Sequence, residues 1–463
     1  MTTTSPSEQG SRPAALLSLA SVVTGVLNYG FTLGIAHYLP ATGYAEFATC
    51  QTIILLATTV ATAALPWLLA REVAQAPGDK PRRERAVWFC LCANAMSGVL
   101  AAALAVALTA RFAAPALSSL LAASVAGNFL LSTWLGWAQG LRRYGLLAAI
   151  TLAQVTTKVA VGLLAAFFKL GVTGILSGNA ISVGALVIVG ALWMRGDLRP
   201  ARGALRSARL WADGTRMALL QATASFLGSV DILTSATVIK VTLRTGSYQF
   251  ANALGRVPTF LAAAIATAAF PVVVASANPT RLINRSYSRL LLVGVPLCIG
   301  LATVPPSLLH IITPSRYSAV LHYAPYSASN GLASAAVIMQ MNFLKAAGPG
   351  RRLVLACAGC CTATAVAVAA AALADGVNGI AIAASVTVWA DVAVIMMATR
   401  TSWAEVLPPL RTVLAAGAMA AVLLLAHPVP AIWVVASAAV AIVAVVLAFD
   451  VRPKMPVRAL VAK

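Results

Sequence analysis

Apolar runs of about 20 residues recur along the whole chain, and they limit the possible folds more than any other feature. A helix needs about 20 apolar residues to cross a bilayer, and only helices or closed barrels satisfy their own backbone there. Of the 463 residues, 60% are hydrophobic and only 10% are charged. A soluble domain carries about 25% charged residues. The sequence therefore predicts an all-α polytopic membrane protein.

The apolar runs predict fourteen spans. The first begins near Ala14 and is too long for the apolar part of a signal peptide. The predicted spans cover residues 14–37, 45–69, 87–110, 115–139, 145–168, 171–194, 217–239, 247–275, 288–311, 321–344, 353–373, 378–398, 410–426 and 430–449.

The distribution of basic residues in the loops supports this arrangement. With the N-terminus in the cytoplasm, 26 of the 33 Lys and Arg residues fall in inside segments and 5 in outside segments. Basic residues accumulate on the cytoplasmic side of membrane proteins. The net charge of +21 is thus explained by topology, and we expect no nucleic-acid partner. Both termini are predicted to be cytoplasmic.

Two short motifs occur twice, in the same order. T-G-x-x-[E/Q]-F-A occurs at residues 42–48 and 245–251, and T-A-A-x-P occurs at residues 62–66 and 267–271. Such a recurrence indicates two copies of one large unit. Because the repeat places the first span on the seventh, each copy has six spans and both insert in the same orientation. Parallel repeats of this kind occur in transporters whose substrate path lies between two halves.

The predicted organisation has two parallel six-helix lobes and two extra C-terminal helices. The basic linker between the lobes contains six arginines and Trp211. It either lies on the anionic inner leaflet or is a solvated connection that only fixes the topology. The predicted parts are a polar cytoplasmic tail (1–12), an N-terminal lobe (13–194), a basic cytoplasmic linker (195–216), a C-terminal lobe (217–400), and two extra helices with a basic cytoplasmic tail (401–463).

Four charged residues fall well inside predicted spans: Lys158, Asp231, Arg256 and Asp391. A charge at mid-bilayer costs about 2.5–3.5 kcal/mol on insertion scales, so such residues pair or face a wet cavity. From the rise of a helix, Lys158, Asp231 and Arg256 lie roughly 10–14 Å below the outer surface, and Asp391 roughly 20 Å. We therefore predict a polar chamber between the lobes, with these four residues as candidate substrate-binding groups.

Asn28 joins this group, because the repeat places it on Asp231. It either lines the same chamber or forms an interhelical hydrogen bond. For Asp231 and Arg256 the alternative is an ion pair that holds the seventh and eighth spans together, although this leaves Lys158 without a partner. Asp391 can likewise pair with a nearby polar group such as Trp389.

No metal or other cofactor is predicted. Cys357, Cys360 and Cys361 are closely spaced, but no His or carboxylate lies near them in the sequence, and unpaired Cys packs as a small hydrophobe. The nucleotide-binding motif G-x-x-x-x-G-K-[S/T] is absent from the sequence. Energy for transport would come from an ion gradient, of protons or sodium, or from consumption of the product. Lys240, Arg244 and His310 are expected at the outer membrane interface.

Residues 28–48, N-Y-G-F-T-L-G-I-A-H-Y-L-P-A-T-G-Y-A-E-F-A, resemble the opening of polysaccharide flippases of the Wzx type. These belong to the multidrug/oligosaccharidyl-lipid/polysaccharide (MOP) exporter superfamily. V-D-I-L at 230–233, T-G-S-Y at 245–248, G-L-R-R-Y-G-L-L at 140–147 and P-S-R-Y-S-A-V at 314–320 are similar to it as well. The resemblance covers essentially the whole chain.

This resemblance implies alternating access between two lobes in a bacterial plasma membrane. The cargo it implies is an oligosaccharide on an undecaprenyl-type pyrophosphate, turned from the inner to the outer leaflet. Such a cargo serves cell-surface polysaccharide synthesis, of which lipopolysaccharide is one example. The chain departs from this picture in having only two bases in the chamber, Lys158 and Arg256.

Three alternatives stay open at this point. An ion-coupled multidrug exporter and a peptidoglycan-precursor flippase belong to the same superfamily, although cationic drugs favour an acidic chamber and this one is predicted to be mixed. A membrane glycosyltransferase or polymerase would be an enzyme, and it would need catalytic groups on a sizeable outside loop. Every predicted outside loop is about ten residues or shorter. We therefore expect a transporter and no enzyme.

Overall fold

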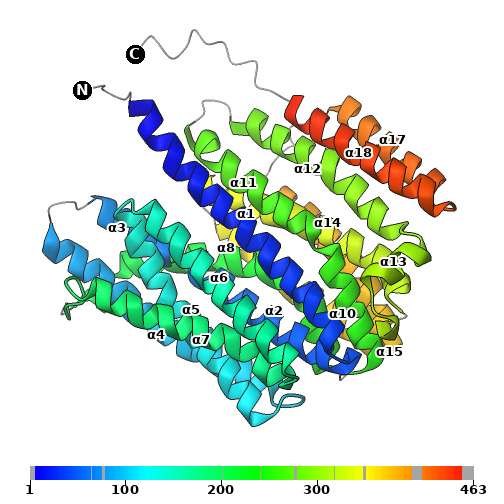
Figure 1. The fold of residues 1–463 in the computed structure, drawn as a ribbon. Coiled ribbons are helices and arrows are strands. Elements are labelled where there is room, and N and C mark those ends of the chain that lie inside the picture. Colours follow the sequence, from blue (N-terminus) through cyan, green and yellow to red (C-terminus); the bar gives the residue numbers. More distant parts are fainter. Residues whose placement is uncertain are drawn as a thin grey trace, which may run out of the picture.

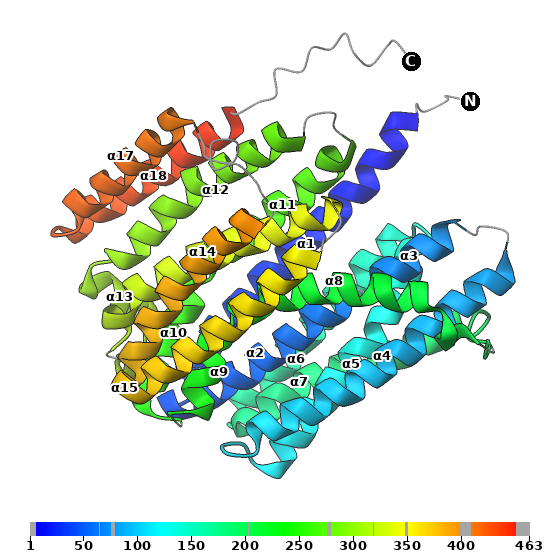
Figure 2. The same cartoon turned by 180° about the vertical axis from the view of Figure 1, so that it is seen from behind.

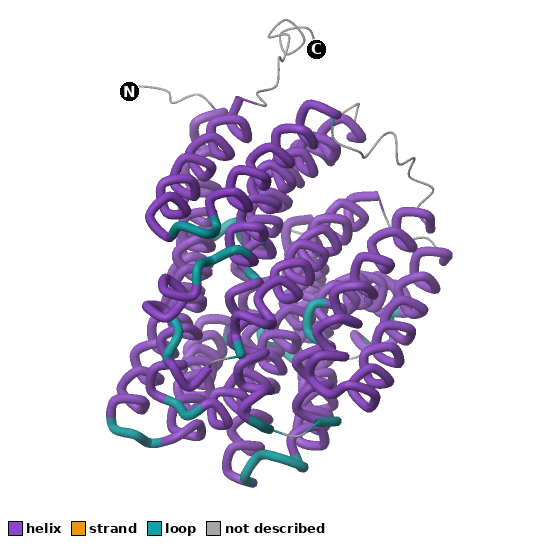
Figure 3. Tube along the Cα trace, turned by 90° about the vertical axis from the view of Figure 1, so that its right-hand side faces the viewer, coloured by secondary structure: helices purple, strands orange, loops and turns teal. Residues whose placement is uncertain are grey.

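The computed structural model consists of helices and their connections, without a strand among the residues it describes (Figure 3). These are residues 6–63, 65–75, 79–201, 203–239, 241–275, 279–317, 319–347, 351–398 and 409–450. Lys240 and the predicted basic C-terminal tail lie outside them.

The N-terminal half contains the six predicted spans. The second span continues from α2 into α3, and the first begins at Pro6, so that part of the predicted polar tail is helical. The helices are α1 (Pro6–Tyr38), α2 (Ala41–Ala63), α3 (Leu65–Gln75), α4 (Lys80–Thr109), α5 (Pro115–Gly140), α6 (Tyr144–Phe167) and α7 (Gly171–Met194).

The C-terminal half repeats this order. It contains η1 (Ala204–Arg206), α8 (Ala208–Leu227), α9 (Val230–Thr237), α10 (Leu243–Gly255), α11 (Val257–Ala275), α12 (Pro279–Ala302), α13 (Pro306–Ile312), η2 (Ser315–Tyr317), α14 (Val320–Ala347) and α15 (Arg351–Ala398). α15 holds two spans, because the chain turns at Asp375 and Gly376. Gly376 has φ of 60°, a conformation that favours glycine.

Two further helices, α17 (Leu410–Ala426) and α18 (Pro430–Asp450), pack against α12 at the edge of the second half (Figure 1). The predicted architecture, two parallel six-helix lobes plus two extra C-terminal helices, is therefore confirmed. By length and composition alone, eight of the described helices can cross a membrane, or up to nine if the bent pair α8–α9 counts as one span.

The two halves meet most closely at one end of the molecule. There the N-terminal ends of α2 and α10 lie together, whereas α3 and α12 lie well apart at the opposite end (Figures 1 and 2). The start of α1, at Pro6, also lies at that opposite end (Figure 1), which the sequence predicts to be cytoplasmic. The lobes thus converge at the end predicted to face outside.

The seventh span is broken, unlike its repeat counterpart α1. α8 and α9 are bent by 61°, and Gly228 and Ser229 lie at the break. The eighth span is interrupted too, since α10 ends at Gly255 and Arg256 is its C-cap. Pro258 accounts for this second break, because proline has no N–H for the carbonyl of Leu254 four residues earlier and its ring crowds that carbonyl.

The predicted outer end of the ninth span is wrong. The ninth span was expected to reach residue 311, but α12 ends at Ala302. The apolar residues beyond it form the separate short helix α13, which begins after Pro305. The connection from α12 to α14 is therefore longer than the ten residues expected of an outside loop, and it contains α13 and η2.

Candidate transport cavity between the lobes

A cavity of about 460 Å³ lies between the two lobes. One side is formed mainly by α1, α2 and α6, and the other by α9, α10 and α11. Of the predicted site residues, Asn28, Lys158 and Arg256 line it. Among the residues that the structure describes, no aspartate or glutamate lines it. The wall of the cavity is therefore cationic.

Lys158 is held by neutral groups. Its Nζ donates to Oδ1 of Asn28 at 2.7 Å and lies 5.5 Å from the centre of the Phe31 ring. Asn28 therefore has both of the roles that the sequence offered for it. It lines the cavity, and it forms an interhelical hydrogen bond from α1 to α6. No carboxylate lies within ion-pair distance of Lys158 in the described part of the chain.

Arg256 lies at the junction of α10 and α11. Its Nη2 donates to the carbonyl oxygen of Gly228 at 2.8 Å, at the end of α8 where the bend interrupts the helix. The last carbonyls of a helix lack intrahelical donors and attract cations. A guanidinium carries five N–H donors, so this bond leaves capacity for an anion in the cavity.

Asp231 is fully buried behind the cavity wall, and its neighbour Ile232 lines the cavity instead. Its Oδ2 accepts from the Tyr248 hydroxyl at 2.7 Å, from Asn330 at 3.2 Å and from Asn252. The alternative ion pair with Arg256 is not formed, because the described ion pairs all involve other residues.

Asp391 lies away from the cavity as well. It accepts a hydrogen bond of 2.6 Å from Thr364, within α15. Trp389, considered as its partner, donates to Ser329 instead. The expectation of a mixed chamber with four charges is thus corrected to a cavity with two cations. A residue's depth along a helix does not define the direction of its side chain around that helix.

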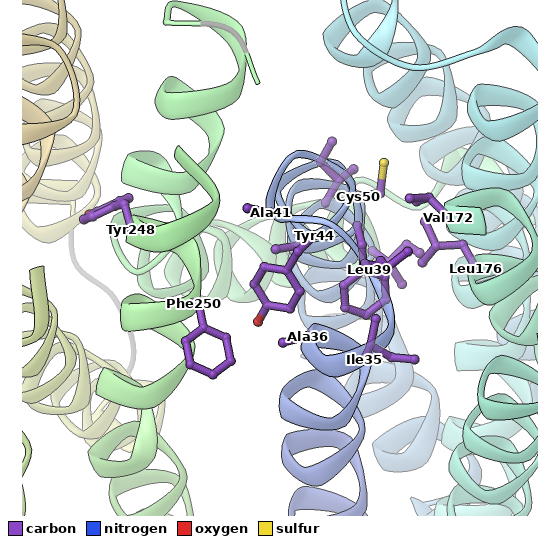
Figure 4. Packing of buried hydrophobic residues seen from close by; sticks show 14 of the residues in the cluster. Ile35, Ala36, Leu39, Ala41, Tyr44, Cys50, Val172, Leu176, Tyr248 and Phe250 are labelled. Carbon is purple, nitrogen blue, oxygen red and sulfur yellow. The ribbon is translucent and has the colours of Figure 1, made fainter. Parts of the chain in front are cut away.

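Three aromatic side chains close the cavity at the end where the lobes converge. Tyr44 of α2, Phe250 of α10 and Tyr317 of η2 have ring centres 5.1–5.6 Å apart, and each is almost fully buried. Figure 4 shows Tyr44 and Phe250 side by side between the two lobes. We call these three residues the aromatic seam.

The repeated motif builds this closure. Both copies of T-G-x-x-[E/Q]-F-A lie near the starts of α2 and α10, and they pack on each other. Gln249 donates to Thr49 of the other lobe at 3.0 Å. Tyr317 donates to the Ala36 carbonyl at 3.2 Å. Tyr317 was missed as a contact between lobes, and its P-S-R-Y-S-A-V segment was the available signal.

At the opposite end of the molecule, polar contacts fix the linker to the N-terminal lobe. Asp197 accepts from Arg83 at 2.8 Å and from the Trp137 indole at 2.9 Å. Arg71 of α3 pairs with Asp213 of α8 at 2.8 Å. The basic linker is therefore a folded part of this face, and whether it touches lipid stays a prediction.

Two repeated lobes around a central cationic cavity define a membrane transporter. A model of the polysaccharide biosynthesis protein family matches residues 12–276, more than half of the chain. The chain belongs to this family. A comparison with curated proteins finds no match.

Solved structures with a similar fold include the lipid II flippase MurJ in an inward closed conformation. Its TM-score is 0.73 at 12% identity, covering 94% of this chain and 99% of that one. A multidrug resistance MATE family transporter of the MOP superfamily is similar in its inward-facing conformation, with a TM-score of 0.57 at 14% identity over 83% and 99% of the chains. A multidrug resistance MATE family transporter of the MOP superfamily in an outward-facing conformation gives a TM-score of 0.58 at 12% identity over 85% and 96% of the chains. The predicted likeness in fold to transporters of the MOP superfamily is thereby confirmed, and at these identities the structures show the fold alone.

Proposed function

We propose that the protein flips a lipid-linked oligosaccharide, carried on an undecaprenyl-type pyrophosphate, from the inner to the outer leaflet by alternating access. The observation that supports this most is the charge of the cavity wall. Lys158 and Arg256 line it, one from each lobe, and no carboxylate of the described part of the chain does. The membership in a polysaccharide biosynthesis family agrees with such a cargo.

The chemistry of a pyrophosphate fits these two cations. A sugar–pyrophosphate head group cannot enter hydrocarbon unaided, because its charges would lose their hydration. In a cavity shielded from bulk water, a cation attracts phosphate oxygens through charge-assisted hydrogen bonds. Lys158 supplies a point charge, and Arg256 supplies a planar fork that matches phosphate geometry.

The closure of the cavity suggests the direction of loading. We place the aromatic seam on the outer side, so that this conformation takes its cargo from the cytoplasmic side of a bacterial plasma membrane. Release outside would then require Tyr44 to separate from Phe250 and Tyr317. The energy source would be a proton or sodium gradient, or consumption of the exported product.

Two other kinds of cargo can be compared with the cavity by their charge. A cationic drug is disfavoured, because it would meet two cations and no counter-charge. A peptidoglycan precursor also carries a pyrophosphate, so charge alone does not exclude it. A glycosyltransferase or polymerase activity has no support from the cavity, because no acidic pair lines it.

Reconstitution in liposomes tests the proposal. Three fluorescent probes are placed in the inner leaflet: an undecaprenyl pyrophosphate oligosaccharide, a lipid II analogue and a cationic dye. We expect accelerated appearance of the oligosaccharide probe on the outside, measured by a membrane-impermeant quencher. Transport of the dye alone would contradict the proposal, and preference for the lipid II analogue would reassign the protein to peptidoglycan synthesis.

A further inference from the structure

Neutral polar side chains cover the side of the cavity formed by the N-terminal lobe. They recur at helical spacing, so that each of three helices turns one polar face toward the cavity. These residues are Thr24, Asn28 and Thr32 on α1, Gln51, Thr58 and Thr62 on α2, and Thr151 and Gln154 on α6. We call these eight residues the polar wall.

The hydroxyls of this wall are directed to act as acceptors. Thr32, Thr62 and Thr151 each donate to the backbone carbonyl one turn earlier, at 2.8–2.9 Å. A hydroxyl whose proton is used in this way keeps its oxygen lone pairs for another donor. The polar wall is thus rich in acceptors.

Several buried polar atoms around the cavity have no hydrogen-bond partner among the described residues. They include the Oη of Tyr44 and the Oε1 of both Gln51 and Gln249, and all three residues line the cavity. Tyr44 is 0% exposed and Gln249 1%. Buried polar groups are nearly always hydrogen-bonded, so these atoms require water or a ligand.

We infer that the polar wall binds uncharged sugar residues of the glycan, while Lys158 and Arg256 hold its pyrophosphate. This inference rests on the proposed function. Sugar hydroxyls and acetamido N–H groups supply the donors that an acceptor-rich neutral wall requires. An acidic sugar would place more negative charge against these acceptors, and an amino sugar would meet no carboxylate. The glycan next to the carrier is therefore of the neutral class.

The test measures binding to the purified full chain with three probes. They are a polyprenyl pyrophosphate alone, the same pyrophosphate with a neutral trisaccharide, and the same with a uronic-acid trisaccharide. In the wild type we expect the neutral glycan to bind at least about tenfold more tightly than the bare pyrophosphate, which corresponds to about 1.4 kcal/mol. We expect the uronic-acid probe to gain nothing.

Two variants locate the effect. Thr58→Val with Gln51→Leu removes polar groups from the wall and should abolish most of the glycan's gain while leaving the bare pyrophosphate unchanged. Thr59→Val is the matched control, because Thr59 lies on the same helix, does not line the cavity and bonds its own helix at Leu55. All three probes should bind this control as they bind the wild type.

The outcomes of this experiment distinguish failure of the polar wall as a sugar-binding surface from failure of the proposed function. Equal loss of all probes in the double variant, or tighter binding of the uronic-acid probe by the wild type, would overturn the polar wall as a binding surface for neutral sugars. If the wild type fails to bind the bare pyrophosphate, or if Lys158→Met leaves that binding unchanged, the proposed function itself is wrong.

Discussion

The guanidinium of Arg256 donates to the carbonyl oxygen of Gly228 at 2.8 Å, so the cation at one helix break caps the open end of another. This contact links the bend between α8 and α9 to the junction of α10 and α11. Both breaks lie in the part of the C-terminal lobe that faces the cavity. Arg256 can therefore stabilise the lobe and contact an anion at once, and its substitutions should separate these two roles.

For Arg256, we expect Arg256→Lys to retain the fold and part of the transport, because a point charge stays while the planar fork is lost. Arg256→Ala should lose most transport and also about 1–3 kcal/mol of stability, since the Gly228 carbonyl is left without its donor. Transport in liposomes and thermal unfolding in detergent measure the two effects. Full transport by Arg256→Ala would exclude a cargo role.

Lys158→Ala should lower transport with little change in the amount of protein in the membrane. Its Nζ is held by the neutral Asn28 rather than by a carboxylate, so its removal leaves no opposite charge unpaired. We expect the Lys158→Ala, Arg256→Ala double variant to be inactive. Wild-type transport by this double variant, measured against membrane protein level, would eliminate the cationic cavity as the cargo site.

For Asp231 the structure predicts tolerance of Asp231→Asn. The three donors converge on Oδ2, while Oδ1 is buried without a partner. An asparagine can place its oxygen toward the donors and its NH₂ in the other position. Asn28, the repeat counterpart, already carries an amide.

Combining this change with Arg256→Gln distinguishes a paired from an unpaired arrangement. The two residues form no ion pair, but the charge of Asp231 still acts on Arg256, so we expect a small interaction energy of about 0.5–1 kcal/mol in a thermodynamic cycle. An interaction energy of about 3 kcal/mol or more, with stability recovered in the double variant, would show that the two residues act as a buried ion pair.

Hydropathy, loop charge and the internal repeat were enough to predict the architecture. The predicted boundaries of α7 and α17 agree with the structure at both ends. The end of the ninth span was predicted wrongly, because hydropathy does not detect a break in a helix. The apolar residues of α13 continued the apolar pattern beyond Pro305. Composition thus locates the apolar segments, whereas the turn before α13 follows Pro305 and the turn within α15 lies at Asp375 and Gly376.

The candidate site was predicted in part. Lys158, Arg256 and Asn28 line the cavity, whereas Asp231 and Asp391 do not. The estimate of depth treated every charge at one level as a neighbour, but side-chain direction depends on packing. Neutral residues such as Gln51 and Tyr44 were missed, because a polar residue of modest insertion cost does not stand out in a sequence.

Topology is testable at two exposed positions. Single cysteines at Arg206 and Arg244, in a chain without its seven native cysteines, should react from opposite sides of the membrane. Arg206 lies in the basic linker and should be cytoplasmic, while Arg244 lies at the start of α10 and should react from outside. Membrane-impermeant maleimides applied to intact cells measure this, and labelling of Arg206→Cys from outside would invert the orientation.

Gly246 should be required for closure of the cavity at the aromatic seam. A Cβ at this position would overlap the Ala41 carbonyl of the other lobe, and backbone atoms cannot yield as a flexible side chain does. Gly246→Ala should therefore destabilise only the conformation in which α2 and α10 touch. A penalty of about 3 kcal/mol would raise an outward-open population of about 1% to roughly half.

A cysteine introduced at Thr32, which lines the cavity, reports the outward-open population by its rate of labelling. The native cysteines are removed for this measurement. We expect much faster labelling by an external impermeant maleimide in Gly246→Ala than in the parent, together with reduced transport. Gly43→Ala is the matched control, because Gly43 is the repeat counterpart and its added Cβ would meet only side chains of its own lobe, the Pro40 ring at 3.3 Å and Leu39 at 3.7 Å. Equal labelling of the two variants would mean that the contact between Gly246 and Ala41 does not hold the cavity closed.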